Sequence, residues 1–203
     1  MFLTFLLGIV ASATHVMTGP DHLAAVTPLA IENKKKSWII GISWGIGHTT
    51  GLLLIGGLFY LFREMFPVKM ISEYSEIIVG IILVIIGMWA FYKLLNKNKH
   101  KHKEAKNVKA AVFVGILHGF AGIYHILIVL PALALPSQAE AVAYLIGFAV
   151  GTVAVMAVYA WSLGTVSHKA ASLNRQKFLT GFRIFGGSAA IIVGIVWIVL
   201  SFK

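Results

Sequence analysis

The first apolar stretch of the chain carries three side chains that can bind a cation. His15 and His22 lie on either side of Asp21, the only aspartate in the sequence, and Gly19-Pro20 comes directly before it. Imidazole and carboxylate groups together suit Ni²⁺, Co²⁺, Zn²⁺, Cu²⁺ or Fe²⁺, whereas Mg²⁺ and Ca²⁺ prefer oxygen-rich sites. Because a charge at the centre of a bilayer costs about 2.5–3.5 kcal/mol on insertion scales, a carboxylate here is expected to have a function.

Three further histidines are predicted to lie at a similar depth. His48 is ten residues after Trp38, which is about 15 Å along a helix and near the middle of a bilayer. His118 and His125 bracket the same depth in a later stretch, seven residues apart and therefore on one helix face. The sequence predicts one cation site built from these residues: His15, Asp21, His22, His48, His118 and His125.

The Gly19-Pro20 pair is expected to break the first helix. Glycine can end a helix in the left-handed conformation, and proline is tolerated at the first position of the next helix. Asp21 and His22 would then lie in the first turn of that second helix. The positive end of the helix dipole favours a carboxylate there.

Membrane-spanning helices are the elements that must position these residues. The chain is 59% hydrophobic with a mean hydropathy of +0.88, and about 20 apolar residues suffice to cross the hydrocarbon core. Six stretches qualify, at about 2–31, 38–62, 71–92, 110–135, 139–163 and 180–202. We therefore predict an all-α polytopic membrane protein with six transmembrane helices, embedded in the lipid bilayer.

The basic residues indicate an orientation rather than a nucleic-acid partner. The net charge is +10, and fourteen of the seventeen Lys and Arg residues lie in or beside the loops 32–37, 93–109 and 164–179. By the positive-inside rule these loops are cytoplasmic and both termini face outward, in the plasma (inner) membrane. His100 and His102 lie in the second loop. We interpret them as ordinary residues of a solvated loop rather than as a tract that collects metal.

An internal repeat divides the chain into two halves. The motif from His15 to Pro28 recurs from His118 to Pro131, with His, Gly, His, Val and Pro matched at a constant offset of 103 residues. The halves, 1–92 and 110–203, each hold three predicted helices and are joined by 93–109, so the second half enters the membrane inverted. Inverted repeats of this kind are typical of secondary transporters. Tyr124 stands where Asp21 would recur, so the site is expected to be asymmetric.

Cysteine is absent, which excludes thiolate metal sites, disulfide relays and iron–sulfur clusters. No permanently bound cofactor and no enzymatic activity are expected. One alternative remains from another class, a membrane redox protein or metalloenzyme with histidine-ligated haem or metal. A second alternative is a structural membrane partner of a metalloenzyme assembly, and a homo-oligomer is left open.

Two segments resemble the nickel/cobalt transporter superfamily. His15 followed by Asp21-His22-Leu23, and Trp44-Gly45-Ile46-Gly47-His48-Thr49 in the next stretch, are similar to its H-A-x-D-A-D-H and L-G-H-S/T signatures. The closer match is its six-span branch of urease-accessory membrane proteins, where the form H-x-x-T-G-P-D-H occurs. More distantly, the two-times-three-helix plan is similar to thiol-disulfide membrane transporters and lysine/sulfite exporters.

The resemblance implies a secondary permease for a divalent transition metal, nickel or cobalt first, with signature residues as ligands. It carries over to His15, Asp21, His22 and His48. The sequence departs from the nickel/cobalt form at one acid, near whose place Thr18 stands, and in the spacing from His15 to His22, which is seven residues rather than six.

Overall fold

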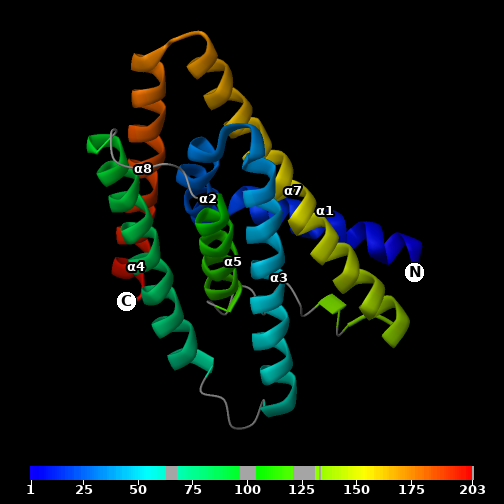
Figure 1. Ribbon diagram of the computed structural model, residues 1–203. Coiled ribbons are helices and arrows are strands. Elements are labelled where there is room, and N and C mark those ends of the chain that lie inside the picture. The colour runs from blue at the N-terminus through cyan, green and yellow to red at the C-terminus, as the bar shows by residue number, and fades with distance from the viewer. Residues whose placement is uncertain (63–67, 97–103, 121–130, 133, 203) are drawn as a thin grey trace.

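The computed structural model describes residues 1–62, 68–96, 104–120, 131–132 and 134–202, and the long elements in these ranges are helices (Figure 1). Their bounds are α1 Phe2–Thr18, α2 Pro20–Asn33, the 3-10 helix η1 Lys34–Lys36, α3 Ser37–Phe62, α4 Val68–Leu95, α5 Glu104–Phe120, α7 Gln138–Ser172 and α8 Gln176–Leu200. The prediction of an all-α chain is confirmed for the described residues.

Four helical stretches are long and apolar enough to cross a membrane. They are Pro20–Leu58, Glu76–Leu95, Gln138–Ser172 and Gln176–Leu200, and the first contains α2, η1 and most of α3. The apolar helices Phe2–Thr18 and Asn107–Phe120 are shorter. The protein is therefore an integral membrane protein, and the predicted spans 2–31 and 110–135 are the two in which no single long helix is described.

The predicted break in the first span is confirmed, with a different backbone geometry. α1 ends at Thr18 and α2 begins at Pro20, which places Asp21 in the first turn of α2. Gly19 between them is extended, with φ −85° and ψ 99°, rather than left-handed. Glycine is needed for space instead, because a Cβ at this position would meet His22 Nδ1 and lie 3.0 Å from Asp21 Oδ1.

The helices form one bundle with α2 in its interior. Figure 1 shows α2 between the α4–α8 pair and α3, and α2 contacts α3, α4, α7 and α8. Val26 of α2, Trp44 of α3 and Met156 of α7 are fully buried in the shared core. Large apolar side chains such as Val158 and Ile192 are exposed on the outside, as expected of a surface that faces lipid.

The basic connections lie at one end of the bundle, as the charge pattern predicts. Figure 1 shows the α2–α3 and α7–α8 connections and the end of α4 together there. The predicted loop bounds differ from the structure, because α7 continues to Ser172, leaving 173–175 between helices, and α5 begins at Glu104. The loop 32–37 is shorter as well, since α2 ends at Asn33 and α3 begins at Ser37. Lys169 lies in the last turn of α7, where a cation is favourable near the helix C-terminus.

Close packing of α3 against α5 brings their histidines together. A Cβ on Gly115 would lie 2.9 Å from the His48 amide nitrogen, and one on Gly119 would meet the His48 carbonyl oxygen. Small residues let two helix backbones approach in this way in membranes. His48 on α3 therefore lies beside the turn of α5 that carries His118.

Candidate metal centre

The break between α1 and α2 places two histidines face to edge. His15 is in the last turn of α1 and His22 in the first turn of α2, and their ring centroids are 4.4 Å apart at an interplanar angle of 84°. His22 is buried, whereas His15 is half-buried. Because the chain leaves α1 and enters α2 through a single extended glycine, both imidazoles face one small space.

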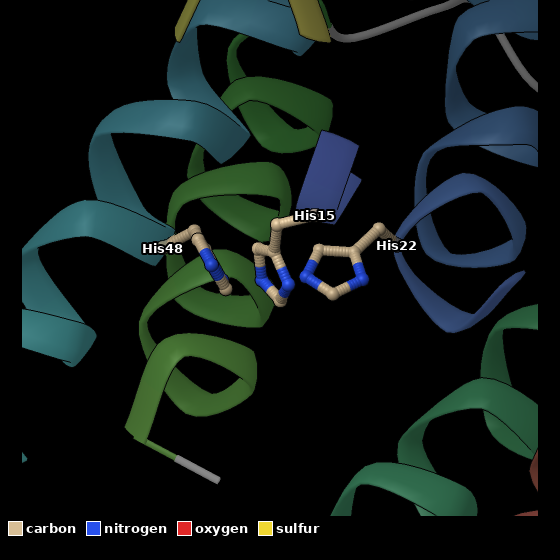
Figure 2. Close-up of side chains that lie close together, drawn as sticks. All are labelled: His15, His22 and His48. Carbon is tan, nitrogen blue, oxygen red and sulfur yellow. The ribbon is translucent and has the colours of Figure 1, made fainter. Parts of the chain in front are cut away.

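α3 adds a third imidazole to this space. His48 is fully buried, and its ring centroid is 5.0 Å from that of His22 and 5.8 Å from that of His15. Figure 2 shows the three side chains entering from different helices and directed toward one another. Each offers one ring nitrogen such that the three atoms lie within 4.8 Å of one another.

α5 brings His118 to the other side of His22. His118 Nε2 is 2.9 Å from Asp21 Oδ2, and Asp21 Oδ1 is 3.0 Å from His22 Nδ1. Asp21, His22 and His118 form a second group whose ligand atoms lie within 4.8 Å of one another, and all three residues are buried. His22 belongs to both groups, so it is the centre of the cluster.

Five of the six residues predicted for the site therefore come together: His15, Asp21, His22, His48 and His118. The sixth, His125, lies outside the described residues, as do His100 and His102. Four imidazoles and one carboxylate in a buried space are a donor set for Ni²⁺, Co²⁺, Zn²⁺ or Cu²⁺ rather than for Mg²⁺ or Ca²⁺. The ligand role of each residue stays a prediction.

Trp44 is a member of the site that the sequence reasoning missed. Its indole ring lies parallel to the His48 ring, with centroids 4.8 Å apart at 7°, and is 5.5 Å from the rings of both His22 and His118. The available signal was its position four residues before His48, on the same helix face. The ring centroid of Phe148, on α7, lies 6.0 Å from that of His15, so aromatic rings of α3 and α7 both lie against the cluster.

The fold and the cluster together define a class: an all-α integral membrane protein with a buried histidine–aspartate cluster at a broken helix. The family described as "Cytochrome C biogenesis protein transmembrane region" matches residues 3–196, and the chain belongs to it. The chain contains no cysteine.

Similar proteins occur in plants and bacteria. The chain is 36% identical over 180 residues to "Chloroplast protein FOR GROWTH AND FERTILITY 1" and 34% identical over 174 residues to "Chloroplast protein FOR GROWTH AND FERTILITY 2", both of Arabidopsis thaliana. Each match covers 79% of this chain and 49% or 46% of the relative, so the chain spans about half the length of these relatives.

A bacterial relative is matched over more of its length. The chain is 33% identical over 177 residues to "Urease accessory protein UreH" of Bacillus sp. (strain TB-90), covering 78% of this chain and 75% of that protein. No solved structure matches. The description of the matched family as a transmembrane region agrees with the membrane assignment.

Proposed function

We propose that the protein is a secondary permease for a divalent transition-metal cation, nickel or cobalt first. The observation that carries the proposal is the convergence of His15, Asp21, His22, His48 and His118 at the broken helix. The similarity to a urease accessory protein favours nickel. The cation is the transported substrate, and the cluster is where it binds.

The proposal includes an inverted repeat of the halves 1–92 and 110–203, joined by 93–109. A second, weaker echo of the repeat is the sequence Ile-Ile-Val-Gly-Ile, which occurs at 77–81 and again at 191–195, in the third predicted helix of each half. The packing of α4 on α8 supports the repeat, because the matched Gly80 and Gly194 lie against each other. A Cβ on Gly80 would lie 2.7 Å from the Gly194 carbonyl oxygen, and one on Gly194 2.6 Å from that of Gly80. Self-contact of matched residues is what a pseudo-two-fold axis in the membrane plane produces.

The pairing of the remaining helices supports the same axis. α1 packs on α7 and α5 packs on α3, and the repeat matches α1 with α5 and α3 with α7. The site then lies where the halves meet, since α1, α2 and α3 supply four of its residues and α5 supplies His118. Rocking of one half against the other would expose such a site to each side in turn. We place the lysine-rich end in the cytoplasm and both termini outside, in the plasma (inner) membrane.

Transport is favoured over the redox alternative by the spacing of the rings. His22 lies with its ring centroid 4.4 Å from that of His15, 5.0 Å from that of His48 and 4.8 Å from that of His118. These contacts leave no room for a porphyrin plane between His22 and any of these three imidazoles. A haem held between His22 and any of these three histidines does not fit the structure.

Uptake into proteoliposomes tests the proposal. Purified protein should carry Ni²⁺ or Co²⁺ in preference to Zn²⁺, Cu²⁺ and Mn²⁺. His22→Ala should abolish uptake and lower metal affinity by well over 100-fold, beyond the roughly 10–100-fold expected for an outer-shell partner, because His22 belongs to both ligand groups. His168→Ala on α7, outside the cluster, is the matched control and should leave uptake unchanged. Absence of uptake of all five metals would contradict the proposed function.

A further inference from the structure

Asp21 is held by two imidazoles at once. His22 Nδ1 lies 3.0 Å from one carboxylate oxygen and His118 Nε2 lies 2.9 Å from the other. An ionised carboxylate only accepts hydrogen bonds, so the protonated nitrogen of each ring must face it. His22 therefore donates through Nδ1–H and His118 through Nε2–H.

These hydrogen bonds determine which nitrogen of His22 can take a metal. A neutral imidazole carries one N–H, so donation through Nδ1 leaves the lone pair of His22 on Nε2. Figure 2 shows the ring nitrogen of His22 that is farther from its backbone, Nε2, directed toward His15. The lone pair thus faces the group made with His15 and His48, away from Asp21.

A carboxylate that holds the far N–H of a metal-binding imidazole is a recurrent arrangement in metal sites, where it sets the tautomer and the ring orientation. We propose, on the basis of the permease function above, that Asp21 is a positioning residue of the cation site and not one of its ligands. The cation is bound by three neutral imidazoles, those of His15, His22 and His48. Asp21 acts through His22, and His118 fixes the second oxygen of Asp21.

The glycine of the helix break fits this role. A Cβ at position 19 would meet His22 Nδ1, the atom that donates to Asp21, and would lie 3.0 Å from Asp21 Oδ1. Gly19 therefore keeps open the space in which the Asp21–His22 hydrogen bond forms. Since its φ of −85° and ψ of 99° are open to any residue, Gly19→Ala changes this space without backbone strain and without removing a ligand.

The charge balance also agrees with an orienting role. Three neutral imidazoles bring no negative charge to a divalent cation, and the buried carboxylate of Asp21 stands one ring away from it. Asp21 can thus stabilise the bound cation through His22 without occupying a coordination position. A site with only imidazole ligands suits Ni²⁺, Co²⁺, Cu²⁺ and Zn²⁺, and it excludes Mg²⁺ and Ca²⁺.

Because Asp21 is the only aspartate of the chain, isotope labelling isolates its carboxylate. Protein of this sequence produced with aspartate labelled with ¹³C at the side-chain carboxyl gives one labelled aspartate carboxylate, with one antisymmetric and one symmetric infrared band. On addition of Ni²⁺ or Co²⁺, the separation between the antisymmetric and symmetric stretches should stay that of a free carboxylate. A change to the separation of a coordinated carboxylate, with metal bound, would overturn the positioning role while leaving the permease intact.

X-ray absorption on the same metal-loaded protein gives the second readout. Asp21→Asn, His118→Ala and Gly19→Ala should each lower affinity by roughly 10–100-fold with the number of imidazole scatterers unchanged. His15→Ala and His48→Ala should each lower that number by one. Glu76→Gln, a carboxylate-to-amide change elsewhere, is the matched control for Asp21→Asn and should leave affinity unchanged. If Asp21→Asn altered the number or type of atoms bound to the metal, the inference would be wrong. If wild type bound no metal, the proposed function itself would be wrong.

Discussion

Two buried carboxylates lie at opposite ends of α2, and their partners differ in kind. Asp21, in the first turn, accepts hydrogen bonds from the imidazoles of His22 and His118. Glu32, in the last turn, lies 2.7 Å from Arg183 Nε and 3.5 Å from Lys93 Nζ. Both carboxylate side chains are 8% exposed, so burial does not distinguish them.

The difference lies in what the partners can do besides compensate a charge. Guanidinium and ammonium groups are donors with no acceptor capacity, so they hold Glu32 without offering a lone pair to a metal. Imidazole donates through one nitrogen and binds metal through the other. The C-terminal end of α2 is therefore held to α4 and α8 by a permanent ion pair. The N-terminal end is suited to reversible binding of a cation.

Removing the Glu32 ion pair should give the largest loss of stability. Glu32→Ala leaves Arg183 and Lys93 without their carboxylate, which costs about 3 kcal/mol, the low end for a buried pair because these two side chains are 21% and 14% exposed. Denaturant unfolding in detergent measures it. Glu140→Ala, at a carboxylate 3.7 Å from the N-terminal amine with a side chain 28% exposed, is the matched control and should cost less than about 1 kcal/mol.

The same variant also tests whether the two ends of α2 are separate. Glu32→Ala protein that remains folded should bind Ni²⁺ or Co²⁺ with wild-type affinity, because Glu32 lies ten residues after His22 on α2, which is about 15 Å along the helix. A loss of affinity as large as that of Asp21→Asn would show that the two carboxylates act as one unit and would break the comparison.

A smaller effect on metal affinity is expected from Trp44, whose ring lies against the cation site. Trp44→Phe keeps a ring against His48 but loses part of the parallel contact at 4.8 Å. An aromatic pair is worth about 0.5–1.5 kcal/mol, so metal affinity should fall roughly threefold to tenfold. Isothermal titration measures the change. Trp161→Phe, at an exposed tryptophan of α7, is the control, and an equal fall there would remove Trp44 from the site.

The sequence alone was sufficient to predict how the N-terminal part of this site is arranged. Gly19-Pro20 predicts the helix break because both residue types act locally, and that places Asp21 and His22 in one turn. The contact between Asp21 and His118 could not be predicted, because it depends on how closely α5 packs against α3. A repeat reveals matched residues but not the distances between helices.

Glu32 shows a second limit of sequence reasoning. A glutamate followed by Asn33 and three lysines has the composition of a solvated loop, and it was included in the predicted loop 32–37. α2 instead continues to Asn33, and the partners of Glu32 come from α4 and α8, 61 and 151 residues later in the chain. Local composition indicates the membrane boundary but not the tertiary ion pair that forms there.

The smallest expected effect lies midway along α2, where neither charge nor metal is involved. Thr27 donates to the Leu23 carbonyl oxygen at 2.6 Å, so Tyr159 of α7 must donate its O–H to Thr27 Oγ1, also at 2.6 Å. Tyr159→Phe removes a donor and leaves Thr27 still bonded within its helix, so it should cost only about 0.5–1 kcal/mol. Tyr74→Phe, at an exposed tyrosine of α4, is the control.

Removing the other partner of this hydrogen bond should cost more, because the loss of stability depends on which partner is left unsatisfied. Thr27→Val leaves the partly buried Tyr159 hydroxyl without its acceptor, and an unsatisfied group of this kind costs about 1–3 kcal/mol. Denaturant unfolding should therefore rank Thr27→Val below Tyr159→Phe in stability, with metal affinity unchanged in both. Equal losses would mean that water reaches the middle of α2. A fall in metal affinity would mean that the cation site depends on the whole helix rather than on its first turn.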